Sequence, residues 1–486
     1  MRTARFAICL LFVAFVCTGV TAWADEPTAF DQGVAAYEKQ DFKAAKGFFL
    51  KALEEQPGHV VIMCWVGSAS LQAGELADAE KYLTQALEKK PEYPEAHNNL
   101  GNVYLAQGKL SLAEQHYEKA IAQQDDYADA RYNLANLYAK QKQWDKAFNE
   151  FNRAIKLAPD DADIHRNFGH ALWQAGRLDK ALREYEVANK LQPKDPKVLS
   201  ALGILYLNSG DNAAAARAYE QAVEADPNMA EAQLGLGIAL YNLGKFADAV
   251  QPLAAASTLD ESSFAAKYNL GLTFAATGDL EAAEKTYRGA LILEPDHAKC
   301  LNNLGWVLQQ SGRPDAAIEP LQKAVEAEPT LDMAHINLAL AYEQAGDKQA
   351  ARKQWEDAAA RFPQNADAHF GLANSYYAAT ENDKALQEYL RALAIKEQNP
   401  EAHNNVGLIY LDQNNFAEAA VHFRTALQQD AAFANAANNL GVALERQNKL
   451  DEAKQMYQKA LEIDPDCQPA QKNLRRLEPA PETATG

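Results

Sequence analysis

The sequence predicts an all-α protein of the α-solenoid type, and three observations indicate this. A 34-residue pattern recurs thirteen times between Glu26 and Cys467 with no insertion or deletion. Alanine occupies both position twenty and position twenty-seven of every repeat. Within each repeat the small and apolar residues stand three or four positions apart, which places them on one face of a helix.

The repeat from Pro94 to Tyr127 illustrates the pattern. Leu100, Gly101 and Tyr104 share one helix face, and the alanines at positions twenty and twenty-seven share another. Gly108 and Lys109 interrupt the apolar pattern between them. Each repeat is therefore predicted to form two antiparallel amphipathic helices joined by a short turn.

Three positions predict how these helices pack. Position eight is always Gly or Ala, and positions twenty and twenty-seven are always Ala, so neighbouring helices approach closely there. Position twenty-four is large, for example Phe49, Tyr117 or Trp355, and is expected to fill the remaining space. Proline ends the second helix in most repeats because it cannot donate a backbone hydrogen bond.

The period and these positions resemble the tetratricopeptide repeat family. The resemblance implies a right-handed superhelix in which first helices line a concave groove, with positions two, five, six, nine and twelve pointing into it. The motif Asn-Asn-Leu-Gly at Asn98–Gly101 is similar to the repeats of O-linked N-acetylglucosamine transferase, in which an asparagine ladder holds the backbone of an extended polypeptide. The carboxylate clamp of chaperone adaptors is absent here.

Asparagines form the candidate partner-binding groove. Asparagine is not a favoured residue inside a helix, so its recurrence at position six requires another reason. A carboxamide can both donate to and accept from a peptide backbone, which suits a groove that grips chain regardless of sequence. The alternative is that each asparagine bonds to an adjacent helix and stiffens the stack. The candidate residues are Asn99, Asn133, Asn167, Asn269, Asn303, Asn337, Asn405 and Asn439 at position six, and Asn102, Asn136 and Asn374 at position nine.

The two ends of the chain differ from the repeats. Residues 1–24 combine Arg2 and Arg5, an apolar run and Ala22-Trp23-Ala24, which predicts a cleaved secretory signal peptide. The repeat region is expected at 25–467 and a capping helix at 468–477, where Arg475 replaces the small residue of position eight. Residues 478–486 are typical of a disordered tail.

No catalytic, cofactor-binding or metal-binding motif is found. The signal, repeats and cap account for the whole chain, so an enzyme is not expected. His97, His165, His335, His369 and His403 recur at position four, which separates neighbours by about 8–10 Å, too far to share one metal ion. The net charge of −19 disfavours nucleic acid and anionic membranes as partners.

These observations favour an exported, periplasmic scaffold that binds extended or helical segments of partner proteins in its groove. A second hypothesis is a structural subunit of an envelope assembly, such as polysaccharide export, pilus or secretion machinery. A third is an accessory subunit of a glycosyltransferase on another chain, suggested only by the resemblance of the asparagine ladder. The oligomeric state and the partner stay open.

Overall fold

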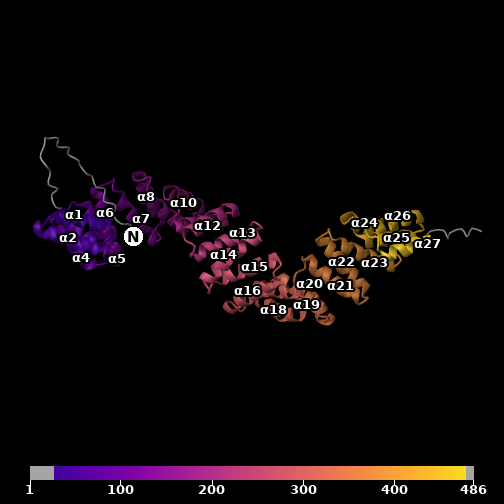
Figure 1. The fold of residues 1–486 in the computed structure, drawn as a ribbon. Helices are drawn as coiled ribbons and strands as arrows, with labels where there is room; N and C mark the ends of the chain where they lie inside the picture. Colours follow the sequence, from indigo (N-terminus) through magenta and orange to yellow (C-terminus); the bar gives the residue numbers. More distant parts are fainter. Residues whose placement is uncertain (1–26, 478–486) are drawn as a thin grey trace, which may run out of the picture. The chain divides into compact units, whose positions relative to one another are not determined.

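The computed structural model describes residues 27–477, and all regular secondary structure in that range is α-helical. The predicted signal peptide and the predicted tail lie outside the described residues. The chain divides into two compact units, Met1–Pro227 with helices α1–α12 and Asn228–Gly486 with helices α13–α27. Figure 1 shows the helices in their order along the chain. The all-α prediction is confirmed, and each unit is an α-solenoid of helix pairs.

The helices alternate between a first and a second helix in each repeat. Those of the first unit are α1 (Ala29–Glu38), α2 (Phe42–Glu55), α3 (Val60–Gln72), α4 (Leu76–Lys89), α5 (Pro94–Ala106), α6 (Leu110–Gln123), α7 (Ala128–Lys140), α8 (Trp144–Leu157), α9 (Ala162–Gln174), α10 (Leu178–Leu191), α11 (Pro196–Asn208) and α12 (Asn212–Ala225). Those of the second unit are α13 (Ala230–Asn242), α14 (Phe246–Leu259), α15 (Phe264–Thr277), α16 (Leu280–Leu293), α17 (Ala298–Gln310), α18 (Pro314–Ala327), α19 (Asp332–Gln344), α20 (Lys348–Arg361), α21 (Ala366–Ala378), α22 (Asn382–Ile395), α23 (Pro400–Asp412), α24 (Phe416–Gln429), α25 (Ala434–Arg446), α26 (Leu450–Ile463) and α27 (Gln468–Leu477).

The turn inside each repeat has the same backbone conformation. Position fifteen, just after the first helix, has a positive φ in all thirteen repeats, as at Gly108 with a φ of 76°. Glycine adopts this left-handed conformation without a steric penalty, which explains its frequency there. Five repeats nevertheless place another residue at this position, namely Gln40, Lys142, Thr380, Asn414 and Asn448.

The same positions are buried in each repeat. The alanines at positions twenty and twenty-seven are buried in every repeat. At Gly101 in position eight, an added Cβ would stand 2.6 Å from the ring of Tyr117 in position twenty-four, well inside van der Waals contact. The large residue therefore occupies the volume that the missing side chain leaves, which confirms the predicted pairing of a small with a large residue.

The last helix, α27, covers the segment expected to cap the repeats. It packs on α26, and Ala470 is its buried residue. Arg475, at the position that is Gly or Ala in the repeats, is exposed. The three cysteines of the described region, Cys64, Cys300 and Cys467, are buried and free of disulfides.

Candidate binding surface

The first helices of successive repeats form a continuous face within each compact unit. In the first unit α3 contacts α5, and α5 contacts α7; in the second, α17 contacts α19. Pairs of second helices are not among the helix pairs in close contact in the described part of the chain. Since the first helices stand closer together than the second helices, they line the inner face of each unit.

The asparagines at position six connect neighbouring first helices across this face. Asn133 donates its Nδ2 hydrogen to Oδ1 of Asn98, at position five of the preceding repeat, over 2.9 Å. The donor and acceptor are 35 residues apart, one more than the repeat length. The same offset joins Asn99 to Cys64, Asn167 to Tyr132, Asn303 to Tyr268, Asn337 to Asn302 and Asn439 to Asn404. These side chains therefore connect repeats, as the stiffening alternative requires.

Two asparagines at position six bond differently, and their neighbours explain why. The residue at position five before Asn269 is Leu234, which cannot accept, so Asn269 donates to its own helix at Ala265 O over 2.8 Å. Before Asn405 that position is Phe370, and Asn405 donates to the hydroxyl of Tyr389 over 3.1 Å. Each asparagine at position six thus donates at least one amide hydrogen within the protein.

The side-chain oxygens of three position-six asparagines remain available as hydrogen-bond acceptors. The Oδ1 atoms of Asn133, Asn167 and Asn269 accept no hydrogen bond from any residue between 27 and 477. These three side chains are half-buried. They can therefore accept from the backbone N–H groups of a partner.

The asparagines at position nine are oriented by buried tyrosines in two repeats. The hydroxyl of Tyr117 donates to Oδ1 of Asn102 over 2.7 Å, and that of Tyr389 donates to Oδ1 of Asn374 over 2.6 Å. Their Nδ2 groups remain as donors on half-buried side chains. Asn136 instead donates Nδ2 to Tyr132 O in its own helix. The predicted residues therefore have different roles, and spacing alone did not separate them.

The sequence analysis missed the partners at position five and an equivalent residue in the cap. Asn473 of α27 donates to Oδ1 of Asn438 over 3.0 Å, with the same offset of 35 residues. Asn473 could have been predicted from the repeat, because it falls at position six when the 34-residue count is continued into the cap.

Two exposed apolar side chains lie on the inner face of the second unit. Trp306 at position nine of α17 is 39% exposed, and Met333 at position two of α19 is 48% exposed. Gln309 Nε2 donates to Asn337 O over 2.6 Å and joins these two helices. Both residues expose apolar surface on two first helices that contact each other, and we call Trp306 and Met333 together the Trp306 patch.

The position-four side chains attach each first helix to the preceding loop. The Nε2 groups of the position-four histidines donate to the carbonyl six residues earlier, as His165 does to Pro159 O over 2.9 Å. Nδ1 of His165 bonds Glu184 at position twenty-three over 2.7 Å, and this carboxylate raises the pKa of His165. Each of the five histidines at position four thus bonds the loop that precedes its helix and a side chain on the second helix of its own repeat.

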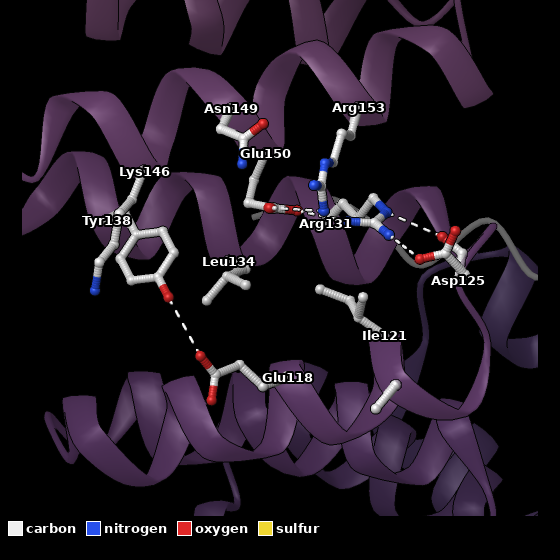
Figure 2. Close-up of a pocket in the computed structure, with 11 residues that line it drawn as sticks. Glu118, Ile121, Asp125, Arg131, Leu134, Tyr138, Lys146, Asn149, Glu150 and Arg153 are labelled. Atoms are coloured by element: carbon white, nitrogen blue, oxygen red, sulfur yellow. Dashed lines mark hydrogen bonds and ion pairs between the residues drawn. The ribbon is translucent and has the colours of Figure 1, made fainter.

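Arg131 takes the place of this histidine beside a cavity of about 370 Å³ between α6, α7 and α8. Figure 2 shows its guanidinium between Asp125 and Glu150, and Tyr138 directed at Glu118. The ion pair of Arg131 with Glu150 spans 2.8 Å. Arg131, Asp125, Glu150 and Arg153 are linked by ion pairs along one wall of this cavity, and Glu118 accepts from the hydroxyl of Tyr138.

In the described part of the chain, no group of three or more His, Cys, Asp or Glu side chains stands close enough to hold a metal ion. Between residues 27 and 477, no helix combines the length and apolar character needed to cross a membrane.

Comparison with family models identifies the repeats. Models described as tetratricopeptide repeats match residues 67–129, 100–162 and 410–477, and a TPR repeat model matches 373–413. The model of the cilia and flagella-associated protein 70 C-terminal domain matches residues 161–369. The chain belongs to the tetratricopeptide repeat family. This assignment agrees with the resemblance inferred from the sequence, and such a repeat fold supports protein–protein interaction.

Solved structures also match the chain. The Cut9–Hcn1 hetero-tetramer structure matches with 12% identity and a TM-score of 0.41, over 92% of this chain and 95% of that one. YrrB, described as a TPR protein with an unusual peptide-binding site, matches with 22% identity and a TM-score of 0.36, over 40% and 100%. A MamA structure matches with 30% identity and a TM-score of 0.34, over 35% and 92%. No curated protein sequence matches the chain significantly.

Proposed function

We propose that this protein is a non-catalytic scaffold that binds extended or helical segments of partner proteins along the inner face of its first helices. The observation that carries the proposal is the Trp306 patch. Tryptophan is enriched among the residues that contribute most to protein–protein binding, because it buries a large area with few rotatable bonds. A solvated Trp306 beside Met333 gives this face an apolar anchor for a partner side chain.

The polar groups on the inner faces of the two units complement a polypeptide backbone. Asn133, Asn167 and Asn269 keep oxygen acceptors, and Asn102 and Asn374 keep amide donors whose orientation Tyr117 and Tyr389 fix. A backbone presents both N–H donors and C=O acceptors, so it needs both kinds of group. The proposed binding role of the asparagines therefore uses the atoms that their bonds within the protein leave available.

Site-specific photo-crosslinking in the source cell tests the proposal. A photoreactive residue at Met333, on the inner face, is expected to crosslink partner proteins, whereas one at Val421 on second helix α24 is not. Val421 is 51% exposed and thus a control of matched exposure. Trp306→Ala should reduce crosslinking from position 333 about tenfold or more. Equal yields from the two positions, or none from 333, would refute a binding role for this face.

Export to the periplasm is part of the proposal and rests on residues 1–24. N-terminal sequencing of the protein purified from the periplasmic fraction is expected to begin at Asp25. Recovery of the chain in the cytoplasmic fraction with residues 1–24 intact would exclude export.

A further inference from the structure

Two repeats contain a pair of histidines that face each other across the helix pair. His97 of α5 and His116 of α6 have their Nδ1 atoms 3.0 Å apart. His403 of α23 and His422 of α24 have the same separation of 3.0 Å. In both repeats the histidines occupy positions four and twenty-three, so one geometry has arisen twice.

The outer nitrogen of the first histidine in each pair is held by a loop carbonyl. His97 Nε2 bonds Pro91 O over 3.1 Å, and His403 Nε2 bonds Glu397 O over 3.3 Å. A carbonyl only accepts, so Nε2 carries the proton and the lone pair of Nδ1 is directed toward the second histidine. Metal-binding histidines in proteins are oriented in this way, by donating their other N–H to a carbonyl or carboxylate.

Burial keeps these rings neutral. It lowers the pKa of His403 and His422, and it lowers the pKa of His116 to about 4. Neutral imidazole is the form that binds metal ions. Nδ1 of His422 donates the hydrogen bond to Nδ1 of His403, so the proton of His422 moves from Nδ1 to Nε2 when both Nδ1 atoms bind an ion. Two nitrogens on one tetrahedral ion at about 2.0–2.1 Å stand about 3.3 Å apart, so a small opening of the pair then admits an ion.

The charges around the two pairs are opposite. Glu418 lies four residues before His422 on α24 and therefore on the same helix face, where its carboxylate interacts electrostatically with His422. The carboxylate of Glu397 interacts in the same way with His403. In the other repeat the residue equivalent to Glu418 is Leu112. There the positive charge of Lys119 lowers the pKa of both His97 and His116. A cation is therefore attracted to the His403 pair and repelled from the His97 pair.

We propose that His403 and His422 bind a divalent cation of the Zn²⁺ class through their Nδ1 atoms, and that the negative charge of Glu418 strengthens this binding. Imidazole nitrogen is a ligand that suits zinc, copper or nickel. Water fills the remaining positions. The His97–His116 pair is a weaker form of the same site, because it lacks the carboxylate.

Calorimetric titration of the full chain with Zn²⁺ tests the site. His422→Gln should lower the affinity of the tightest site at least about tenfold. This variant copies Gln354, which bonds His335 Nδ1 over 2.9 Å in another repeat, so the hydrogen bond and the fold are expected to survive. His116→Gln is the matched control in the other pair and should leave the tight site unchanged.

Glu418→Gln and Leu112→Glu test the role of the carboxylate in opposite directions. The first should weaken the tight site severalfold, and the second should strengthen binding by His97 and His116. Leu112 is 38% exposed, so the change is tolerated by the fold. Circular dichroism melting without metal should be unchanged in all variants. An unchanged Zn²⁺ affinity in a folded His422→Gln variant would overturn the proposal.

Discussion

Tyr117→Ala is expected to lower the free energy of unfolding by about 3–5 kcal/mol, the range for deleting a large buried aromatic ring. Tyr117 is fully buried and fills the volume beside Gly101. Glycine has no side chain with which to refill that volume, so a cavity remains. Denaturant unfolding measures the loss, and hydrogen exchange should place it in α5 and α6, because each repeat contacts only its neighbours.

Tyr117→Phe separates the ring from its hydroxyl. This variant keeps the ring and removes only the hydrogen bond to Asn102, so it should cost about 0.5–1.5 kcal/mol. If the alanine variant proves no less stable than the phenylalanine variant, the ring does not carry the packing that its burial indicates.

Arg131→Ala is expected to cost about 3–5 kcal/mol, because it leaves the carboxylate of Glu150 buried without its main partner. Arg131 is 3% exposed and Glu150 is 8% exposed. Arg153 approaches Glu150 only to 3.6 Å and does not replace the shorter contact that Arg131 makes over 2.8 Å. Chemical denaturation at neutral pH measures the effect.

Arg131→His is the matched control for this prediction. It recreates the pair that His165 and Glu184 form at the same two positions over 2.7 Å. The histidine variant should therefore retain most of the stability that the alanine variant loses. Equal losses of stability in both variants would show that the aliphatic part of the Arg131 side chain, and not its ion pair, stabilises this repeat.

The repeat architecture could be predicted from the sequence because it depends on contacts of fixed spacing. Ala113 and Ala120 predicted close approach, and Gly101 with Tyr117 predicted a filled space; both are observed. The left-handed conformation at position fifteen of each repeat was not predicted from the sequence. Gly108 indicates it, but Thr380 does not, since a β-branched residue rarely adopts a positive φ.

The candidate surface was harder to predict because its bonds cross between repeats. The period of 34 places Asn133 and Asn98 on first helices, but the bond depends on the stagger of one helix against the next. Whether Asn269 bonds its neighbour or its own helix is decided by Leu234 in another repeat. Sequence spacing identifies the asparagines, and only the packed helices show which atom of each remains available.

The asparagine pairs give each stack of first helices a polarity. In the repeats that are linked in this way, the position-five residue accepts from the amide of the following repeat, so the donor always comes from the carboxy-terminal side. Loss of α27 would remove the donor to Asn438, whereas loss of the first two repeats would leave the amide of Asn99 without Cys64. Duplication of one whole repeat would keep the hydrogen bonds between first helices, so the chain can be lengthened by tandem copying without losing these bonds.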